Sequence, residues 1–210
     1  MTIAPKMTMM QAVQLLAAAR PEDAIVVATM GAMSLFDRIE AARGEPRPPG
    51  RLSSVPLMGG AAGLGLGLAL AQPQRQVIVV DGDASLLMEL SGLNTVASQQ
   101  PANLLHLVLH NGTQFTGLAN LRSPHDRFGF AQAARNAGYR IAETIGDADA
   151  FAARLPQLLA TDGPRFVELM VEPLAPAAGA GFEQKEMPDL QFARMGQEAR
   201  ALTDWLGVAP

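Results

Sequence analysis

Short runs of mainly apolar residues, many of them β-branched, recur along this chain, and segments with helical spacing separate them. Val77–Val80 is the clearest run, and Ala24–Ala28, Leu104–Leu109 and Phe166–Val171 follow the same pattern. Strands that are apolar on both faces belong in a parallel sheet that helices cover on both sides, since a sheet with one wet face shows alternating polar residues. The sequence therefore predicts an α/β fold with three layers, α/β/α, around a mostly parallel sheet of about six strands.

Apolar residues at helical spacing predict the helices between these strands. The predicted helices span Met9–Ala19, Ala32–Ala42, Gly59–Ala71, Ser85–Gln99, Phe130–Ala137, Asp147–Ala160 and Leu190–Leu206. Two weaker strands are predicted at Leu52–Val55 and Tyr139–Ala142. A chain of 210 residues fits a single domain, 1–210, and a stretch rich in Pro, Ala and Gly after about residue 173 leads into a C-terminal helical extension.

Composition excludes several classes of protein. Hydrophobic residues make up 49% of the chain and charged residues 17%, which excludes a disordered protein. A net charge of −4 without any basic run argues against a nucleic-acid partner. The chain has no cysteine, so it can carry neither a disulfide nor a cysteine nucleophile. Since there is no signal-peptide pattern and no apolar run long enough for a bilayer, we expect a cytoplasmic protein without a membrane partner.

Polar residues follow two of the predicted strands, at the strand ends where ligands bind in parallel sheets. Asp81–Ser85 follows one strand, and His110–Thr113 follows the next. Asn111 comes 28 positions after Asp83, which is the length of one helix-and-strand unit, so the two turns can lie side by side. Carboxylate and amide oxygens suit Mg²⁺, and a helix that begins at Ser85 would offer free N–H groups to an anion.

Gly82-Asp83-Ala84-Ser85, followed at this distance by Asn111, resembles the diphosphate-binding motif of thiamine-diphosphate-dependent enzymes. Pro56–Gly59 and the glycine-rich stretch from Gly63 resemble the turn and helix that precede this motif in the family. Two further segments fit the family pattern, the turn Thr29–Gly31 and the segment Phe115–Gly117. Over roughly residues 20–172, the chain is similar to the β chains of sulfopyruvate decarboxylase and to the matching half of phosphonopyruvate decarboxylase.

The resemblance implies a site for thiamine diphosphate and Mg²⁺. Asp83, the Asn111 side chain and the Thr113 carbonyl would hold the metal, which bridges the two phosphates of the cofactor. Ala84 and Ser85 would lie against the diphosphate. The other cofactor-binding residues that the resemblance implies are Gly31, Gly59, Gly82, Gln114, Phe115 and Met58, the last of which would prop the cofactor in its bent form.

The chain departs from the family pattern at several positions. Ala84 replaces a glycine, which excludes a positive φ at little strain and is expected to narrow the diphosphate cleft. His110 replaces the first of two asparagines, at a position that does not hold the metal, and is a candidate for a substrate contact. The Ser-Arg pair after the first strand of phosphonopyruvate-type chains is absent, and Ala32-Met33-Ser34 stands there. These departures leave the identity of the 2-oxoacid open.

The resemblance implies the diphosphate-binding β subunit of a two-subunit 2-oxoacid decarboxylase, in which the cofactor ylid attacks the 2-oxoacid and CO₂ is lost. Such enzymes need a glutamate from a pyrimidine-binding domain, and Glu89, inside the predicted helix after Ser85, faces the wrong way for that role. We therefore expect a hetero-oligomer with an α subunit that carries this domain and its catalytic Glu. Two alternatives stay open: a carboligase subunit similar to acetolactate synthase, and a non-catalytic scaffold or regulatory homologue, which Ala84 and the missing Arg positions would favour.

Overall fold

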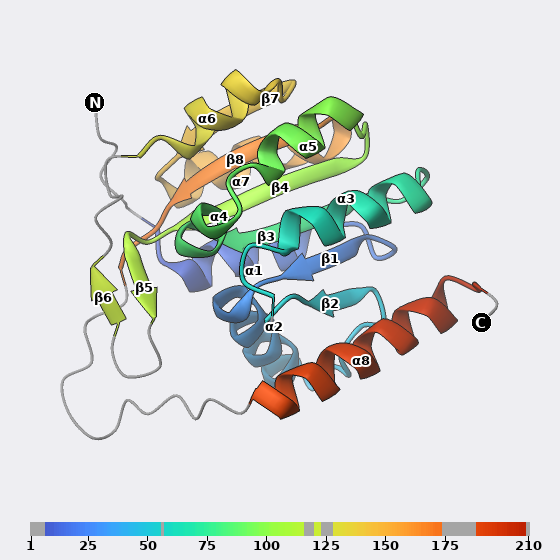
Figure 1. The fold of residues 1–210 in the computed structure, drawn as a ribbon. Helices are drawn as coiled ribbons and strands as arrows, with labels where there is room; N and C mark the ends of the chain where they lie inside the picture. Colours follow the sequence, from blue (N-terminus) through green and yellow to red (C-terminus); the bar gives the residue numbers. More distant parts are fainter. Residues whose placement is uncertain (1–6, 56, 116–119, 123–127, 174–187, 209–210) are drawn as a thin grey trace.

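A six-stranded sheet forms the centre of the computed structural model, which describes residues 7–55, 57–115, 120–122, 128–173 and 188–208 (Figure 1). The strands lie in the order β2-β1-β3-β4-β8-β7, and every neighbouring pair is parallel. Their bounds are Ile25–Ala28 (β1), Arg51–Ser53 (β2), Val77–Gly82 (β3), Leu104–His110 (β4), Ile141–Ile145 (β7) and Arg165–Met170 (β8). The predicted α/β fold with a parallel sheet of about six strands is confirmed.

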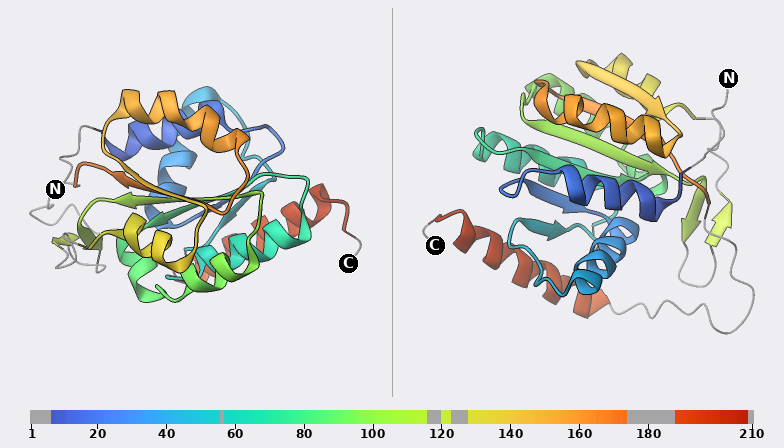
Figure 2. Two further views of the ribbon diagram at one scale, coloured as in Figure 1. Left: turned by 90° about the horizontal axis from the view of Figure 1, so that it is seen from above. Right: turned by 180° about the vertical axis from the view of Figure 1, so that it is seen from behind.

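Helices cover both faces of this sheet, because the central strands are buried on both sides. Along β3, Val77 and Val79 pack into one apolar cluster, whereas Ile78 and Val80 pack into the other. One face is covered by α1 (Met9–Ala19), α2 (Met30–Arg43) and α7 (Ala148–Ala160). The other face is covered by α3 (Ala61–Ala71), α4 (Asp83–Met88), α5 (Gly92–Gln99) and α6 (Phe130–Ala137), as both views of Figure 2 show. None of the described helices is long and apolar enough to cross a bilayer.

Two local expectations were wrong, and one small element was not expected. The predicted helix over Ser85–Gln99 is two helices, α4 and α5, and Glu89 lies at the C-terminal cap of α4, outside a continuous helix. The expected turn at Thr29–Gly31 is the start of α2, with Thr29 at its N-terminal cap. A short antiparallel hairpin of β5 (Thr113–Phe115) and β6 (Asn120–Arg122) was not predicted, because neither strand carries the apolar pattern of a buried one.

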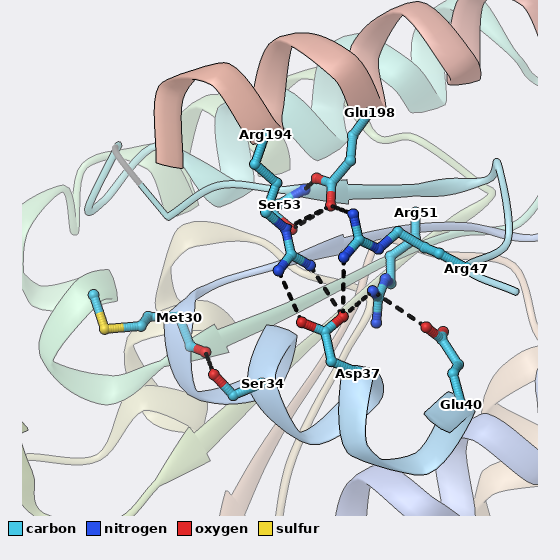
Figure 3. A network of polar contacts seen from close by, with 9 residues as sticks. All are labelled: Met30, Ser34, Asp37, Glu40, Arg47, Arg51, Ser53, Arg194 and Glu198. Atoms are coloured by element: carbon cyan, nitrogen blue, oxygen red, sulfur yellow. Dashed lines mark hydrogen bonds and ion pairs between the residues drawn. The ribbon is translucent and has the colours of Figure 1, made fainter. Parts of the chain in front are cut away.

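The C-terminal helix α8 (Pro188–Trp205) runs along the outer strand β2, and a network of ion pairs fastens it there (Figure 3). Glu198, which is buried, accepts hydrogen bonds from the Ser53 backbone N–H at 2.6 Å and from the Ser53 hydroxyl at 3.1 Å. Arg194 donates to both oxygens of Asp37 on α2, at 2.8 and 3.0 Å. Arg51 on β2 also donates to Asp37, so one carboxylate joins three elements.

Stability should therefore fall in acid in a way that depends on Asp37. Burial alone would raise the pKa of Asp37, but hydrogen bonds from Arg194 and Arg51 lower it below its ordinary value. A carboxyl whose pKa is lower in the folded state stabilises the fold above the unfolded pKa of about 3.9, and this contribution is lost as the pH falls through the folded pKa. We expect Asp37→Asn to be less stable than wild type in urea at pH 7, and the gap to shrink at pH 3. A difference in stability between the two proteins that is equal at both pH values would contradict the lowered pKa of Asp37.

Candidate functional site

A cavity of about 520 Å³ lies at the carboxyl edge of the sheet, between the ends of β1, β3 and β4. The chain leaves β1 toward β2 on one side, while β3 lies on the other side, and such a divergence of connections opens a crevice in parallel sheets. Nine of the predicted site residues line this cavity, namely Gly31, Met58, Gly82, Asp83, Ala84, Ser85, Asn111, Thr113 and Gln114. The fold thus brings together residues that lie more than 80 positions apart in the sequence.

Asp83 joins the two turns that the sequence places at this edge. Its carboxylate is buried, and Oδ2 accepts a hydrogen bond of 2.8 Å from the backbone N–H of Gly112 in the turn after β4. Oδ1 accepts a second bond, of 2.9 Å, from the N–H of Ala84. Each carboxylate oxygen has more than one lone pair, so these bonds are compatible with a cation that Asp83 would bind at the cavity.

Asn111 is held in one orientation by partners on either side of its amide. Its Oδ1 accepts from both the backbone N–H and the hydroxyl of Thr113, each at 2.8 Å. Its Nδ2 faces the thioether sulfur of Met9 on α1, at 3.6 Å. The sulfur can accept but not donate, so this contact favours the amide orientation that places Oδ1 next to Thr113. The sequence carried no signal for the part that Met9 plays here.

The donor set at this edge suits magnesium. It consists of the Asp83 carboxylate and the Asn111 amide oxygen, which would exchange one of its two hydrogen bonds from Thr113 for the metal. The resemblance to the family adds the backbone carbonyl oxygen of Thr113, a residue that lines the same cavity. Among the described residues, no group of three or more His, Cys, Asp or Glu side chains could hold a metal ion. Mg²⁺ is typically held by one or two carboxylates together with waters and the phosphates of a substrate. The residues therefore fit a metal that binds together with a diphosphate rather than alone.

The turn before α3 packs directly against the motif at α4. Gly59 has a φ of +84°, and its N–H donates to the Ser85 hydroxyl oxygen at 3.0 Å. A Cβ on Gly59 would lie 2.8 Å from the Cβ of Glu89, so only glycine allows this close approach. Met58, immediately before it, is half-exposed and lines the cavity. Gly59 itself does not line the cavity, but it contacts Ser85, which does.

Ala84 lies within α4, so it does not need the positive φ that glycine would permit. In a helix, glycine is less favourable than alanine by up to about 1 kcal/mol. We therefore expect Ala84→Gly to lower the free energy of unfolding by roughly this amount, measured in urea, without improving ligand binding. Markedly tighter binding of Mg²⁺ and thiamine diphosphate by Ala84→Gly would instead show that the alanine methyl group narrows the site.

His110 does not line the cavity. Its ring is buried between two carboxylates: Nδ1 donates to Glu168 Oε1 at 2.8 Å, and Nε2 lies 3.8 Å from Asp83 Oδ2. The Phe130 ring packs edge-on against the imidazole, with 5.1 Å between ring centroids. His110 is therefore a buried residue at the end of β4 and does not form part of the cavity surface. Sequence analysis missed Glu168, because it is a single polar residue within an apolar strand.

Other residues singled out in the sequence lie elsewhere. Glu89 is exposed at the junction of α4 and α5, outside the cavity wall. Phe115 is the last residue of β5. Pro56, Thr116 and Gly117 lie outside the described residues.

A family model for thiamine pyrophosphate enzymes, the C-terminal TPP binding domain, matches residues 43–169. The chain is 40% identical over 177 residues to a phosphonopyruvate decarboxylase from Streptomyces viridochromogenes, an alignment that covers 81% of this chain and 41% of the relative. It is 36% identical over 99 residues to the sulfopyruvate decarboxylase subunit beta of Methanothermobacter thermautotrophicus, covering 47% of this chain and 50% of that subunit. These alignments therefore span half or less of the length of each relative.

Solved structures share the fold. The thiamine diphosphate-dependent 4-hydroxybenzoylformate decarboxylase of Rhodococcus jostii superposes with a TM-score of 0.65 at 20% sequence identity, over 83% of this chain and 34% of that one. Benzoylformate decarboxylase from Polynucleobacter necessarius gives a TM-score of 0.63 at 16% identity, over 83% and 35% of the two chains. At these identities the likeness concerns the fold alone.

Proposed function

The chain belongs to the thiamine pyrophosphate enzymes, through their C-terminal TPP binding domain, and from this premise we propose that it is the diphosphate- and Mg²⁺-binding subunit of a 2-oxoacid decarboxylase. The observation that carries the proposal is the hydrogen bond between Asp83 and Gly112, because it joins the two motif turns at one cavity. In this proposal Asp83, Asn111 and the Thr113 carbonyl hold the metal.

The cavity residues have distinct tasks in the proposed reaction. Thiamine diphosphate, when bound, supplies the electron sink that lets a 2-oxoacid lose CO₂. Asp83 and Asn111 would fix the metal, and through it the two phosphates, at the strand ends. Ser85 would contribute its hydroxyl hydrogen to the phosphate, since the hydroxyl oxygen already accepts from Gly59. Met58 would supply the apolar surface that supports the bent cofactor and keeps water away from it.

A partner subunit completes the site in this proposal. The two relatives described above are called phosphonopyruvate decarboxylase and sulfopyruvate decarboxylase, and the second is called a subunit beta. We infer that an α subunit brings the pyrimidine-binding domain and its glutamate to the open side of the cavity, and that the substrate is a small 2-oxoacid. Ala84 fits its helical position without strain, so backbone strain at this residue does not favour the non-catalytic alternative.

Thermal unfolding of the full chain tests this function, alone and with its α partner. Mg²⁺ and thiamine diphosphate are added singly and together, and thiamine without phosphates serves as the control. Because one carboxylate alone is a weak magnesium site, we expect stabilisation only when metal and diphosphate are both present. A ligand at 100 times its Kd stabilises by about 2.7 kcal/mol. An unchanged Tm in a complex whose assembly has been verified would reject the proposal.

A further inference from the structure

Glu168 on β8 gathers hydrogen-bond donors from three other elements. Its Oε1 accepts from His110 Nδ1 at 2.8 Å and from the Phe130 N–H at 3.4 Å. Its Oε2 accepts from the Ala131 N–H at 3.1 Å and from the Thr144 hydroxyl at 2.9 Å. The side chain is buried, and a buried charge persists only where such partners replace water. Burial alone would raise the pKa of Glu168, but the bonds from His110, Ala131 and Thr144 lower it, so the group is a carboxylate.

Three of these donors lie at the two ends of one excursion of the chain, the segment between β4 and α6, whereas Thr144 lies on β7. His110 is the last residue of β4, immediately before Asn111 and Thr113. Phe130 and Ala131 are the first residues of α6, where the chain returns to the sheet. The N-terminal cap of α6 is Gly129, which has no side chain with which to bind the free N–H groups. Glu168 therefore caps α6 from a neighbouring strand while it also holds the ring of His110.

We propose that Glu168 is a positioning residue for the cofactor-binding turn Asn111–Phe115, because it holds His110, the residue before this turn, and connects it to the start of α6. The inference rests on the proposed function insofar as it gives this turn a ligand. The His110 ring, held by Glu168, in turn limits the position of the Asp83 carboxylate, whose Oδ2 lies 3.8 Å from Nε2. Neither Glu168 nor His110 lines the cavity, so both act through other residues rather than on the ligand itself.

Both oxygens of the Glu168 side chain accept hydrogen bonds, so a glutamine amide, which has only one oxygen, cannot replace it. In Glu168→Gln, one oxygen becomes an NH₂ group that faces donors instead of accepting from them. Either the pair His110 and Phe130 or the pair Ala131 and Thr144 then loses its acceptor. Thr144→Val is the matched control, because it removes one bond to the same carboxylate from β7, outside the excursion.

Hydrogen exchange of the unliganded full chain tests the positioning role without any cofactor. In Glu168→Gln we expect faster amide exchange in both Asn111–Phe115 and Phe130–Ala134, whereas Thr144→Val leaves both segments as in wild type. Faster exchange in α6 alone would overturn the proposal, because Glu168 would then be only a helix cap. Should Glu168→Gln fail to fold, His110→Phe, which has no side-chain donor for Glu168, gives the test. Asn111–Phe115 should exchange faster while α6 stays protected, and an unchanged Asn111–Phe115 would overturn the proposal.

Calorimetric titration of thiamine diphosphate at saturating Mg²⁺ links the positioning role to the ligand. Residues that orient metal ligands typically change affinity 10–100-fold when replaced, so we expect about a tenfold or larger rise in Kd for Glu168→Gln. Thr144→Val should keep the wild-type Kd. If the exchange result holds but wild type binds no cofactor even with its partner, the proposed function fails while the positioning role stands. Equal Kd values for Glu168→Gln and wild type would overturn the link.

Discussion

Replacing Asp83 by asparagine is expected to raise the Kd for thiamine diphosphate and Mg²⁺ by at least about 100-fold, which corresponds to about 2.7 kcal/mol of binding free energy. Asp83 contributes the one carboxylate of the proposed metal-binding set, so the substitution removes its full negative charge. It also places an NH₂ group where the Gly112 or the Ala84 N–H needs an acceptor. The turn after β4 would then lose part of its connection to α4.

Calorimetry with Mg²⁺ and thiamine diphosphate measures this effect, and Thr113→Val supplies its control. That variant removes the hydroxyl that donates to Asn111 but keeps the backbone carbonyl proposed to bind the metal. We expect Thr113→Val to bind far more tightly than Asp83→Asn. Similar affinities for Asp83→Asn and wild type would remove Asp83 from the metal site and would leave Asn111 without its proposed companion ligand.

The second large effect is expected from Gly65→Ala in α3. A Cβ at this position would lie 2.2 Å from Val79 Cγ2 on β3, and β3 belongs to the rigid centre of the sheet. The helix must therefore move away from the strand that ends at the cavity. Overpacking of this kind costs roughly 1–3 kcal/mol, and the very short distance places Gly65→Ala at the upper end of that range.

Two other glycines of α3 provide controls for this prediction. Gly63 and Gly67 are exposed, and a Cβ on either would meet no atom within 4 Å. Alanine has the higher helix propensity, so we expect each of these substitutions to stabilise the chain by up to about 1 kcal/mol. Urea unfolding of the three variants thus gives opposite signs within one helix. If Gly65→Ala behaved like Gly63→Ala, the close contact between α3 and β3 would not exist.

The sequence predicted the layered fold well, because its signals are local. The helices Met9–Ala19 and Phe130–Ala137 have the predicted bounds, and Val77–Val80 lies within β3. Runs that are apolar on both faces have few alternatives to a covered parallel sheet. The division of the predicted Ser85–Gln99 helix was missed, since it accompanies a tertiary contact at Glu89 that the glycine at position 59 permits. Helix propensity along a segment contains no information on such a contact.

The sequence likewise predicts some residues of the candidate site and gives no signal for others. Asp83 and Asn111 could be paired from their spacing, since consecutive strands of a parallel sheet end at one edge. Met9 and Glu168 could not be found, because their contacts with Asn111 and His110 join residues about 60 to 100 positions apart and leave no pattern in the local sequence. For the same reason the sequence suggests His110 as a candidate for a substrate contact, although its ring is buried between Asp83 and Glu168.

The position of α8 beside β2 also restricts how this chain can associate with others. An outer strand normally presents unpaired backbone groups to which a strand of another molecule can add. Here the outward N–H of Ser53 donates to Glu198, and α8 runs along that side of the sheet. Sheet extension through β2 is therefore blocked within the chain itself. The α subunit proposed above would therefore have to contact other parts of the chain, such as the rim of the cavity, where a shared active site would need it.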